Sequence, residues 1–151
     1  MILLRDLPNG FWWILIALPS GWLAHSGAYF IGSKFGKHKM VPRLSPKKSW
    51  EGYFGGALVS VIGTPLLILL YQSLGMPESV EISLWQAALF GLLISLVGPI
   101  GDLFGSMLKR MAQVKDSSNL LPGHGGVFDR IDTWIWAASI GFILLNILNI
   151  V

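Results

Sequence analysis

Residues 52–77 read GYFGGALVSVIGTPLLILLYQSLGMP and contain no formally charged side chain. About 20 apolar residues in a helix span the hydrocarbon layer of a bilayer, because a helix pairs its backbone amides within itself. This stretch, Gly52–Pro77, is long enough to do so. Further stretches of the same character predict an all-α integral membrane protein with about four transmembrane helices: Leu7–Ser33, Ile82–Gly101 and Thr133–Val151.

The composition supports this prediction. Of the 151 residues, 53% are hydrophobic and 13% are charged, against roughly 25% charged in soluble domains. The chain has no cysteine, which excludes disulfides and thiolate metal sites. No basic stripe is interleaved with base-stacking aromatics in a soluble module, so we expect no nucleic-acid binding. Aromatic belts at the membrane interface are expected where tryptophans lie near the ends of the apolar stretches: Trp12, Trp13, Trp85, Trp134 and Trp136.

The basic residues predict the orientation. Of the eleven Lys and Arg, six lie between Lys34 and Lys48 and four between Lys109 and Arg130, while the connection around Glu78 has none. The positive-inside rule therefore predicts a multi-pass protein of the cell membrane with both basic loops in the cytoplasm and both termini on the other side.

The first basic loop, residues 33–52, reads SKFGKHKMVPRLSPKKSWEG. Pro42 and Pro46 argue against a continuing helix. The lysines fit an anchor that attracts anionic lipid headgroups. With Ser45 and Ser49 nearby, they fit a phosphate-binding site equally well.

The second basic loop places acids beside bases at the end of a membrane helix. A carboxylate there is costly unless it is solvated, paired or bound to a metal, which singles out Asp102. Asp102, Ser106 and Lys109 share one face if their helix continues to Arg110. Asp129 and Asp132 begin the fourth helix, where acids also complement the helix dipole.

Between these acids, PGHGG at residues 122–126 supplies a permissive backbone. His124 fits a catalytic role or a turn histidine bonded to a carbonyl. Carboxylates without clustered His or Cys favour Mg²⁺, which recruits substrate phosphates as further ligands. Basic residues would then neutralise a transferring phosphoryl group: Lys109, Arg110, Lys115 and Arg130. The residues thus indicate a Mg²⁺-dependent enzyme that acts on a nucleotide or phospholipid phosphate.

Residues 106–132, SMLKRMAQVKDSSNLLPGHGGVFDRID, resemble the signature of the phosphatidate cytidylyltransferases, also called CDP-diacylglycerol synthases. GAYFIGSKFGKHK and SPKKSWEG resemble the preceding segments of that family, in the same order. Members typically carry further helices before this region. The resemblance therefore implies that residues 1–151 are a single membrane domain corresponding to the family's C-terminal, catalytic part, with the N-terminal helices absent.

The resemblance implies a transfer of CMP from CTP to phosphatidic acid in the lipid bilayer, with Mg²⁺ as cofactor. Asp102 and Asp129 would be metal ligands and, with Lys109 and His124, catalytic residues. Substrate phosphates would be held by the remaining polar positions of the two loops: Ser45, Lys47, Lys48, Ser106, Arg110, Lys115 and Arg130.

Two positions depart from the family pattern. WLAHSGAY has His25 where the family usually has Asp, and GDLFGS has Gly105 where it usually has Glu. The alternative to an active enzyme is therefore a truncated or catalytically impaired homologue that acts as a membrane assembly partner. A homodimer is also open, since Gly55, Gly56 and Ala57 permit close helix packing.

Overall fold

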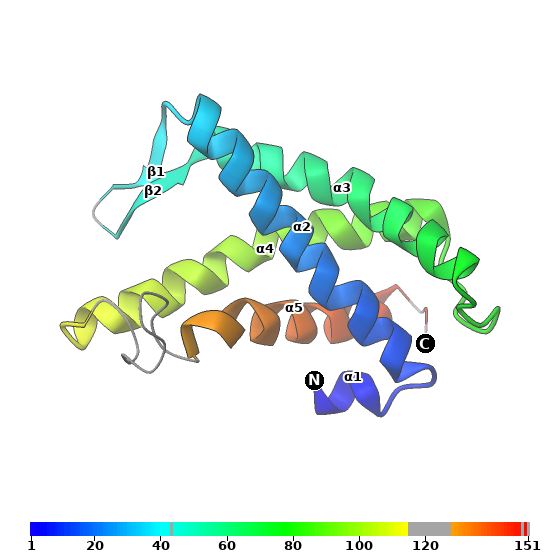
Figure 1. Ribbon diagram of the computed structural model, residues 1–151. Helices are drawn as coiled ribbons and strands as arrows, with labels where there is room; N and C mark the ends of the chain where they lie inside the picture. Colours follow the sequence, from blue (N-terminus) through cyan, green and yellow to red (C-terminus); the bar gives the residue numbers. More distant parts are fainter. Residues whose placement is uncertain (43, 115–127, 149, 151) are drawn as a thin grey trace.

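Long helices and one small hairpin make up the fold, shown in Figure 1 as a computed structural model that describes residues 1–42, 44–114, 128–148 and 150, with the backbone alone for residues 128–133. The elements are α1 (Ile2–Arg5), α2 (Gly10–Phe35), β1 (Lys39–Val41), β2 (Ser45–Ser49), α3 (Trp50–Ser73), α4 (Leu84–Met111) and α5 (Phe128–Ile147). In this described part, α2, α3 and α4 are long and apolar enough to cross a bilayer, and α5 has a shorter apolar stretch, Trp134–Ile147. The predicted helical membrane protein with about four spans is confirmed.

The helix ends differ from the predicted spans. α4 begins at Leu84 because Ser83 and Gln86 form a capping box, in which each side chain bonds to the other residue's backbone amide. The helix then continues past Gly101 to Met111. Asp102 and the polar residues that follow it therefore lie on one unbroken helix, which is the condition for Asp102, Ser106 and Lys109 to share one face. The first basic loop, in which Pro42 and Pro46 argued against a continuing helix, forms the hairpin of β1 and β2.

Small residues let α2 and α3 pack closely. A Cβ added to Gly56 would lie 2.5 Å from the carbonyl oxygen of Ala24 and 3.0 Å from the Cβ of Ala28. At Gly27 an added Cβ would lie 2.7 Å from the Cβ of Val59. Close packing drives helix association where lipid offers no hydrophobic gradient. The close packing that Gly56 permits therefore occurs between two helices of the same chain, α2 and α3.

Buried hydroxyl groups join α2, α3 and α4. The Ser60 hydroxyl lies 2.9 Å from the carbonyl oxygen of Gly91 and 3.2 Å from that of Ser20, and it donates to both. Thr64 donates to the Ser20 hydroxyl at 3.1 Å. All three hydroxyl residues are fully buried. Each such bond between helices stabilises a membrane protein by about 0.6 kcal/mol on average.

The apolar core lies toward the end of the bundle that holds the termini. Trp13, Ile16, Phe90 and Leu145 belong to it and are at most 2% exposed. Trp13 therefore does not join an interfacial belt as expected; its ring is buried, and its indole N–H donates to the carbonyl oxygen of Pro8 at 2.9 Å. Trp85, at 64% exposed, does face outward.

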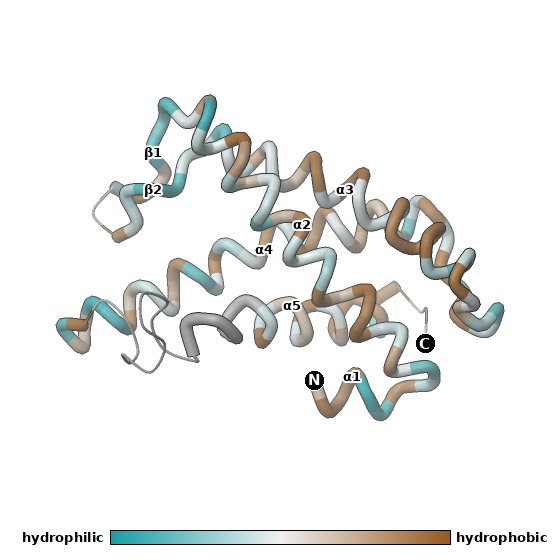
Figure 2. Tube along the Cα trace, in the orientation of Figure 1, coloured by the Kyte–Doolittle hydropathy of each residue, from teal (hydrophilic) through white to brown (hydrophobic). Residues whose placement is uncertain are grey.

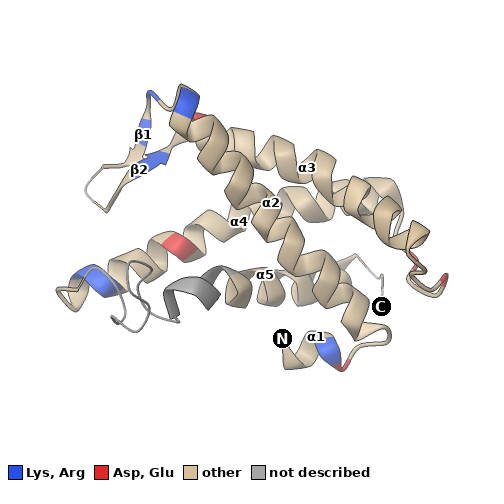
Figure 3. Cartoon of the chain, viewed as in Figure 1, with Lys and Arg blue, Asp and Glu red and all other residues tan. Residues whose placement is uncertain are grey.

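The two ends of the bundle differ in polarity. Hydrophilic residues gather at the hairpin and in the connections, while brown, hydrophobic stretches dominate the long helices (Figure 2). Among the described residues, Lys and Arg lie at the hairpin and at the end of α4, apart from Arg5 on α1 (Figure 3). The acids Glu78 and Glu81 lie in the α3–α4 connection at the opposite end. The fold thus brings charged parts of both predicted loops to one end.

Candidate active site

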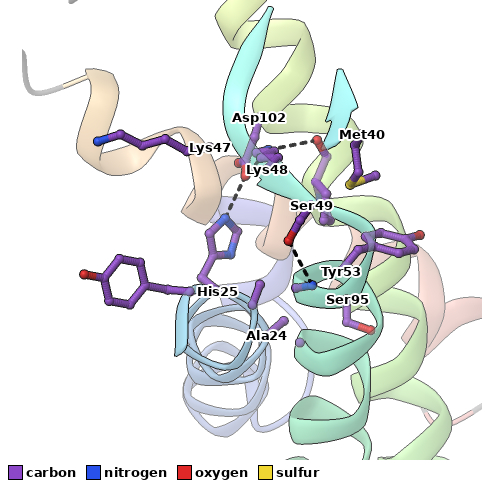
Figure 4. A pocket seen from close by; sticks show the side chains of 14 residues that line it. Ala24, His25, Met40, Lys47, Lys48, Ser49, Tyr53, Ser95 and Asp102 are labelled. Atoms are coloured by element: carbon purple, nitrogen blue, oxygen red, sulfur yellow. Dashed lines mark hydrogen bonds and ion pairs between the residues drawn. The ribbon is translucent and has the colours of Figure 1, made fainter. Parts of the chain in front are cut away.

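The junction of β2 and α3 positions the first basic group. Alternation along a strand sends Lys47 and Lys48 to opposite faces. Figure 4 shows the Lys47 side chain leading away from Asp102, whereas the Lys48 side chain meets it. Ser49 then caps α3, since its hydroxyl oxygen accepts the backbone N–H of Gly52 at 3.2 Å. Ser49 thus joins β2, which carries Lys48, to α3.

Asp102 on α4 receives two donors on the same oxygen, Oδ2. The Lys48 ammonium lies 3.0 Å from this atom, and Nε2 of His25 on α2 lies 2.7 Å from it. Lys48 also donates to the carbonyl oxygen of Pro99 at 3.4 Å. The Asp102 side chain is 15% exposed, so water screens this pairing only in part. Three segments far apart in the sequence therefore meet at one carboxylate oxygen.

The His25 ring is held at both nitrogens. Nδ1 lies 3.1 Å from the carbonyl oxygen of Gly21, one turn earlier on α2, while Nε2 faces Asp102. An imidazolium donates to both oxygens at once, whereas a neutral ring donates to one. In either form His25 supplies no negative charge, and its orientation is fixed by its own helix.

The cluster borders a pocket of about 200 Å³ between α2, the hairpin, α3 and α4. Its walls are mostly small or apolar and include Ala24, Ala28, Gly52 and Gly56. Ligand pockets that take a whole drug-sized molecule measure about 300–1,000 Å³. This pocket therefore suits a part of a larger substrate: a polar group at the lysines with an apolar part against the helices.

At the pocket, the described residues offer a divalent cation one carboxylate, that of Asp102. No group of three or more His, Asp or Glu suited to a metal occurs among them. Oδ1 of Asp102 accepts no hydrogen bond from a described residue, because both donors lie at Oδ2. Mg²⁺ commonly binds through one or two carboxylates together with substrate phosphates. Asp102 fits that mode through Oδ1, as one ligand among several.

The structure brings only part of the predicted site together. Lys47, Lys48 and Asp102 line the pocket, whereas Ser45 on β2 does not. The other predicted site residues on α4 do not line the pocket either. Ser106 and Lys109 are half-buried, and Arg110 is exposed. Lys115 and His124 lie outside the described residues, and for Asp129 and Arg130 only the helical backbone of α5 is described.

The pocket also contains residues that we did not predict for the site. His25 is the main one, and its sequence signal was the replacement of an acidic residue at that position. Tyr53, Tyr29 and Ser95 line the pocket as well. The Tyr53 hydroxyl donates to the carbonyl oxygen of Leu96 at 3.1 Å, which ties α3 to α4. Nothing in their local sequence distinguished these residues from ordinary helix-packing residues.

A sequence model of the cytidylyltransferase family matches residues 1–148. The chain belongs to this family. It is 41% identical over 142 residues to the phosphatidate cytidylyltransferase of Staphylococcus epidermidis, covering 94% of this chain and 50% of that protein. To the phosphatidate cytidylyltransferase of Thermotoga maritima it is 43% identical over 136 residues, covering 89% of this chain and 49% of that protein. This cytidylyltransferase-family chain thus spans about half the length of the curated relatives it matches.

Proposed function

We propose that this chain carries the nucleotidyl-transfer site of a phosphatidate cytidylyltransferase. The observation that supports this most directly is the meeting of Lys48 with Asp102 at a pocket whose walls are mostly small or apolar. Such a pocket suits a substrate with a phosphate at one end and hydrocarbon beyond it. Curated relatives over nearly the whole chain carry that enzyme's name.

In the proposed reaction, a phosphate oxygen of phosphatidic acid attacks the α-phosphorus of CTP. The new P–O bond joins CMP to the lipid, and the bond from the α-phosphorus to the bridging oxygen breaks. Pyrophosphate leaves with that electron pair, and CDP-diacylglycerol stays in the membrane. Because the charge to be stabilised lies on phosphate oxygens, positioning and electrostatics supply most of the catalysis.

The chain's own residues have distinct parts in this proposal. Lys48, held by Asp102, presents its ammonium at the pocket, and Lys47 adds a second positive charge at its edge. We propose Asp102 and Asp129 as the Mg²⁺ ligands; bound Mg²⁺ would neutralise charge on the triphosphate. Further contacts to phosphates are proposed for the other basic and hydroxyl residues of the two loops: Ser45, Ser106, Lys109, Arg110, Lys115 and Arg130. His124 is proposed to orient a substrate group.

Orientation and assembly belong to the same proposal. The positive-inside rule supports cytoplasmic placement of the hairpin end, where CTP is available. A homodimer would need a surface other than the face of Gly56, because α2 already packs there. The exposed aromatic residues of α2, Trp22, Tyr29 and Phe30, supply one such surface.

The test is a transfer assay on the purified chain in mixed micelles. Phosphatidic acid, Mg²⁺ and CTP labelled at the α-phosphate should yield lipid-extractable label and an equal amount of pyrophosphate. Asp102→Asn should lower turnover by at least tenfold while the protein stays monodisperse. If the unaltered chain forms no labelled lipid, the proposal fails and the alternative, an assembly partner, is favoured.

A further inference from the structure

The Lys48 ammonium and the His25 ring already occupy one oxygen of Asp102, the only described acidic side chain at the pocket. An ammonium at 3.0 Å sits where a cation bound to Oδ2 would have to sit. Its second bond, to the Pro99 carbonyl, holds it in this place. A metal ion using this carboxylate must therefore displace Lys48 or bind beside it at Oδ1.

The charges around the pocket oppose a bare dication. Its described lining includes the cations Lys47 and Lys48 and the anion Asp102, so these described residues are net positive even with His25 neutral, and Asp129, the second proposed ligand, is not among them. The described charges by themselves repel a divalent cation that enters alone, in a partly desolvated place where charges interact more strongly than in water. A nucleoside triphosphate carries several negative charges and meets attraction instead. The pocket charges therefore repel the metal ion alone but attract the metal–nucleotide complex.

His25 keeps the cluster in this state. The bond from Nδ1 to the Gly21 carbonyl fixes the ring, so Nε2 stays directed at Asp102. A carboxylate at this position would instead face Asp102 as a second acid. Two close carboxylates repel each other unless a cation lies between them, which favours metal binding without nucleotide.

We infer that this chain takes up its divalent cation only together with the nucleotide, because Lys48 and His25 occupy Asp102 in the nucleotide-free protein. The inference rests on the proposed function for the identity of the nucleotide. It assigns Lys48 and His25 a positioning role: by occupying Asp102 they prevent the cation from binding before the nucleotide.

Mn²⁺ in place of Mg²⁺ tests this directly, because free Mn²⁺ is measured by electron paramagnetic resonance without any turnover. The full chain in detergent, titrated with Mn²⁺ alone, should retain no stoichiometric Mn²⁺ at concentrations up to tenfold above the protein. With CTP added and no lipid present, the protein should retain about one equivalent of Mn²⁺ after removal of free nucleotide. Asp102→Asn should weaken that retention.

Variants of the two neighbouring lysines separate carboxylate occupancy from net charge. Lys48→Gln and Lys47→Gln remove the same charge from the pocket, but only the first removes an ammonium group from Oδ2 of Asp102, where the His25 ring remains. We expect nucleotide-free Mn²⁺ affinity to rise at least tenfold in Lys48→Gln and in His25→Asp, and to change less than threefold in Lys47→Gln.

Two results overturn the inference. One is stoichiometric Mn²⁺ binding by the unaltered chain without CTP, lost in Asp102→Asn; this leaves the proposed function intact. The other is equal gain in the Lys47 and Lys48 variants, which assigns the effect to net charge alone. Failure to retain Mn²⁺ with CTP overturns nucleotide-dependent uptake and also counts against the proposed function, which the transfer assay then decides separately.

Discussion

Asp102 illustrates how one side chain can be predicted correctly while its surroundings are not. A carboxylate at the end of an apolar segment had to be paired, solvated or metal-bound. The structure pairs it with Lys48 from the hairpin and His25 from α2. Sequence spacing along α4 could not supply these partners, because both come from other elements. His25 carried a signal only as a departure from the family pattern.

Because Lys48 is paired with Asp102, Lys48→Met should destabilise the protein more than Lys47→Met. Lys48 is 26% exposed and bonded to Asp102, and loss of a charged hydrogen-bond partner costs about 1–3 kcal/mol. For a chain of this size each kcal/mol lowers Tm by about 2–4 °C. Thermal unfolding in detergent should show a fall of several degrees for Lys48→Met. Equal Tm values for the two variants would show that the Lys48–Asp102 contact contributes no stability.

A second prediction concerns Asp129, a proposed Mg²⁺ ligand on α5 for which only the backbone is described. Asp129→Asn keeps the size of the side chain and removes one proposed ligand charge. Turnover at saturating CTP should fall at least tenfold, and the Mg²⁺ concentration for half-maximal rate should rise. Asp132→Asn is the matched control, since it removes the same charge three residues further along α5 at a residue that is not a proposed ligand. Unaltered Mg²⁺ dependence in Asp129→Asn would remove Asp129 from the metal site.

Among the elements, the helices followed from the sequence and the hairpin did not. Continuous apolar stretches were enough to predict the spans, because length and hydropathy decide membrane insertion. Strand β2 contains Pro46, Pro42 directly follows β1, and only Met40 and Val41 of the strand residues are apolar, so neither alternation nor β-propensity marked the strands. Pairing with each other and the capped start of α3 define this hairpin. The position of Lys48 therefore depended on an element without a local signal.

The α2–α3 contact gives an element-scale prediction about glycine. Gly56→Ala places a methyl group 2.5 Å from the Ala24 carbonyl oxygen, so the two helices must separate. We expect a loss of about 1–3 kcal/mol, as for other overpacked interiors, measured as a lower unfolding midpoint in denaturant.

Gly98→Ala on α4 is the matched control for this substitution. An added Cβ there meets nothing within 4 Å among the described neighbours, and Ala favours a helix interior over Gly by about 1 kcal/mol. Gly98→Ala should therefore leave stability unchanged or raise it. If both variants lost stability equally, the loss in Gly56→Ala could not be assigned to the spacing between α2 and α3.

For the whole molecule, antiparallel helices place both termini at the end opposite the hairpin (Figure 1). The α3–α4 connection, with Glu78 and Glu81, lies at the same end as the termini (Figure 3). This arrangement fixes which segments share a side of the membrane. The uneven distribution of Lys and Arg then predicts which side is cytoplasmic.

Single cysteines test that orientation cleanly, because the chain has none of its own. Ser79→Cys lies in the exposed α3–α4 connection and Lys37→Cys in the exposed turn before β1, so neither disturbs a buried contact. In intact cells a membrane-impermeant maleimide should label Ser79→Cys at once and Lys37→Cys only after permeabilisation. The opposite pattern would place the hairpin outside, away from cytoplasmic CTP, and would contradict both the orientation and the proposed site. Labelling of both positions before permeabilisation would instead contradict the membrane-spanning arrangement of α3, since that helix separates them.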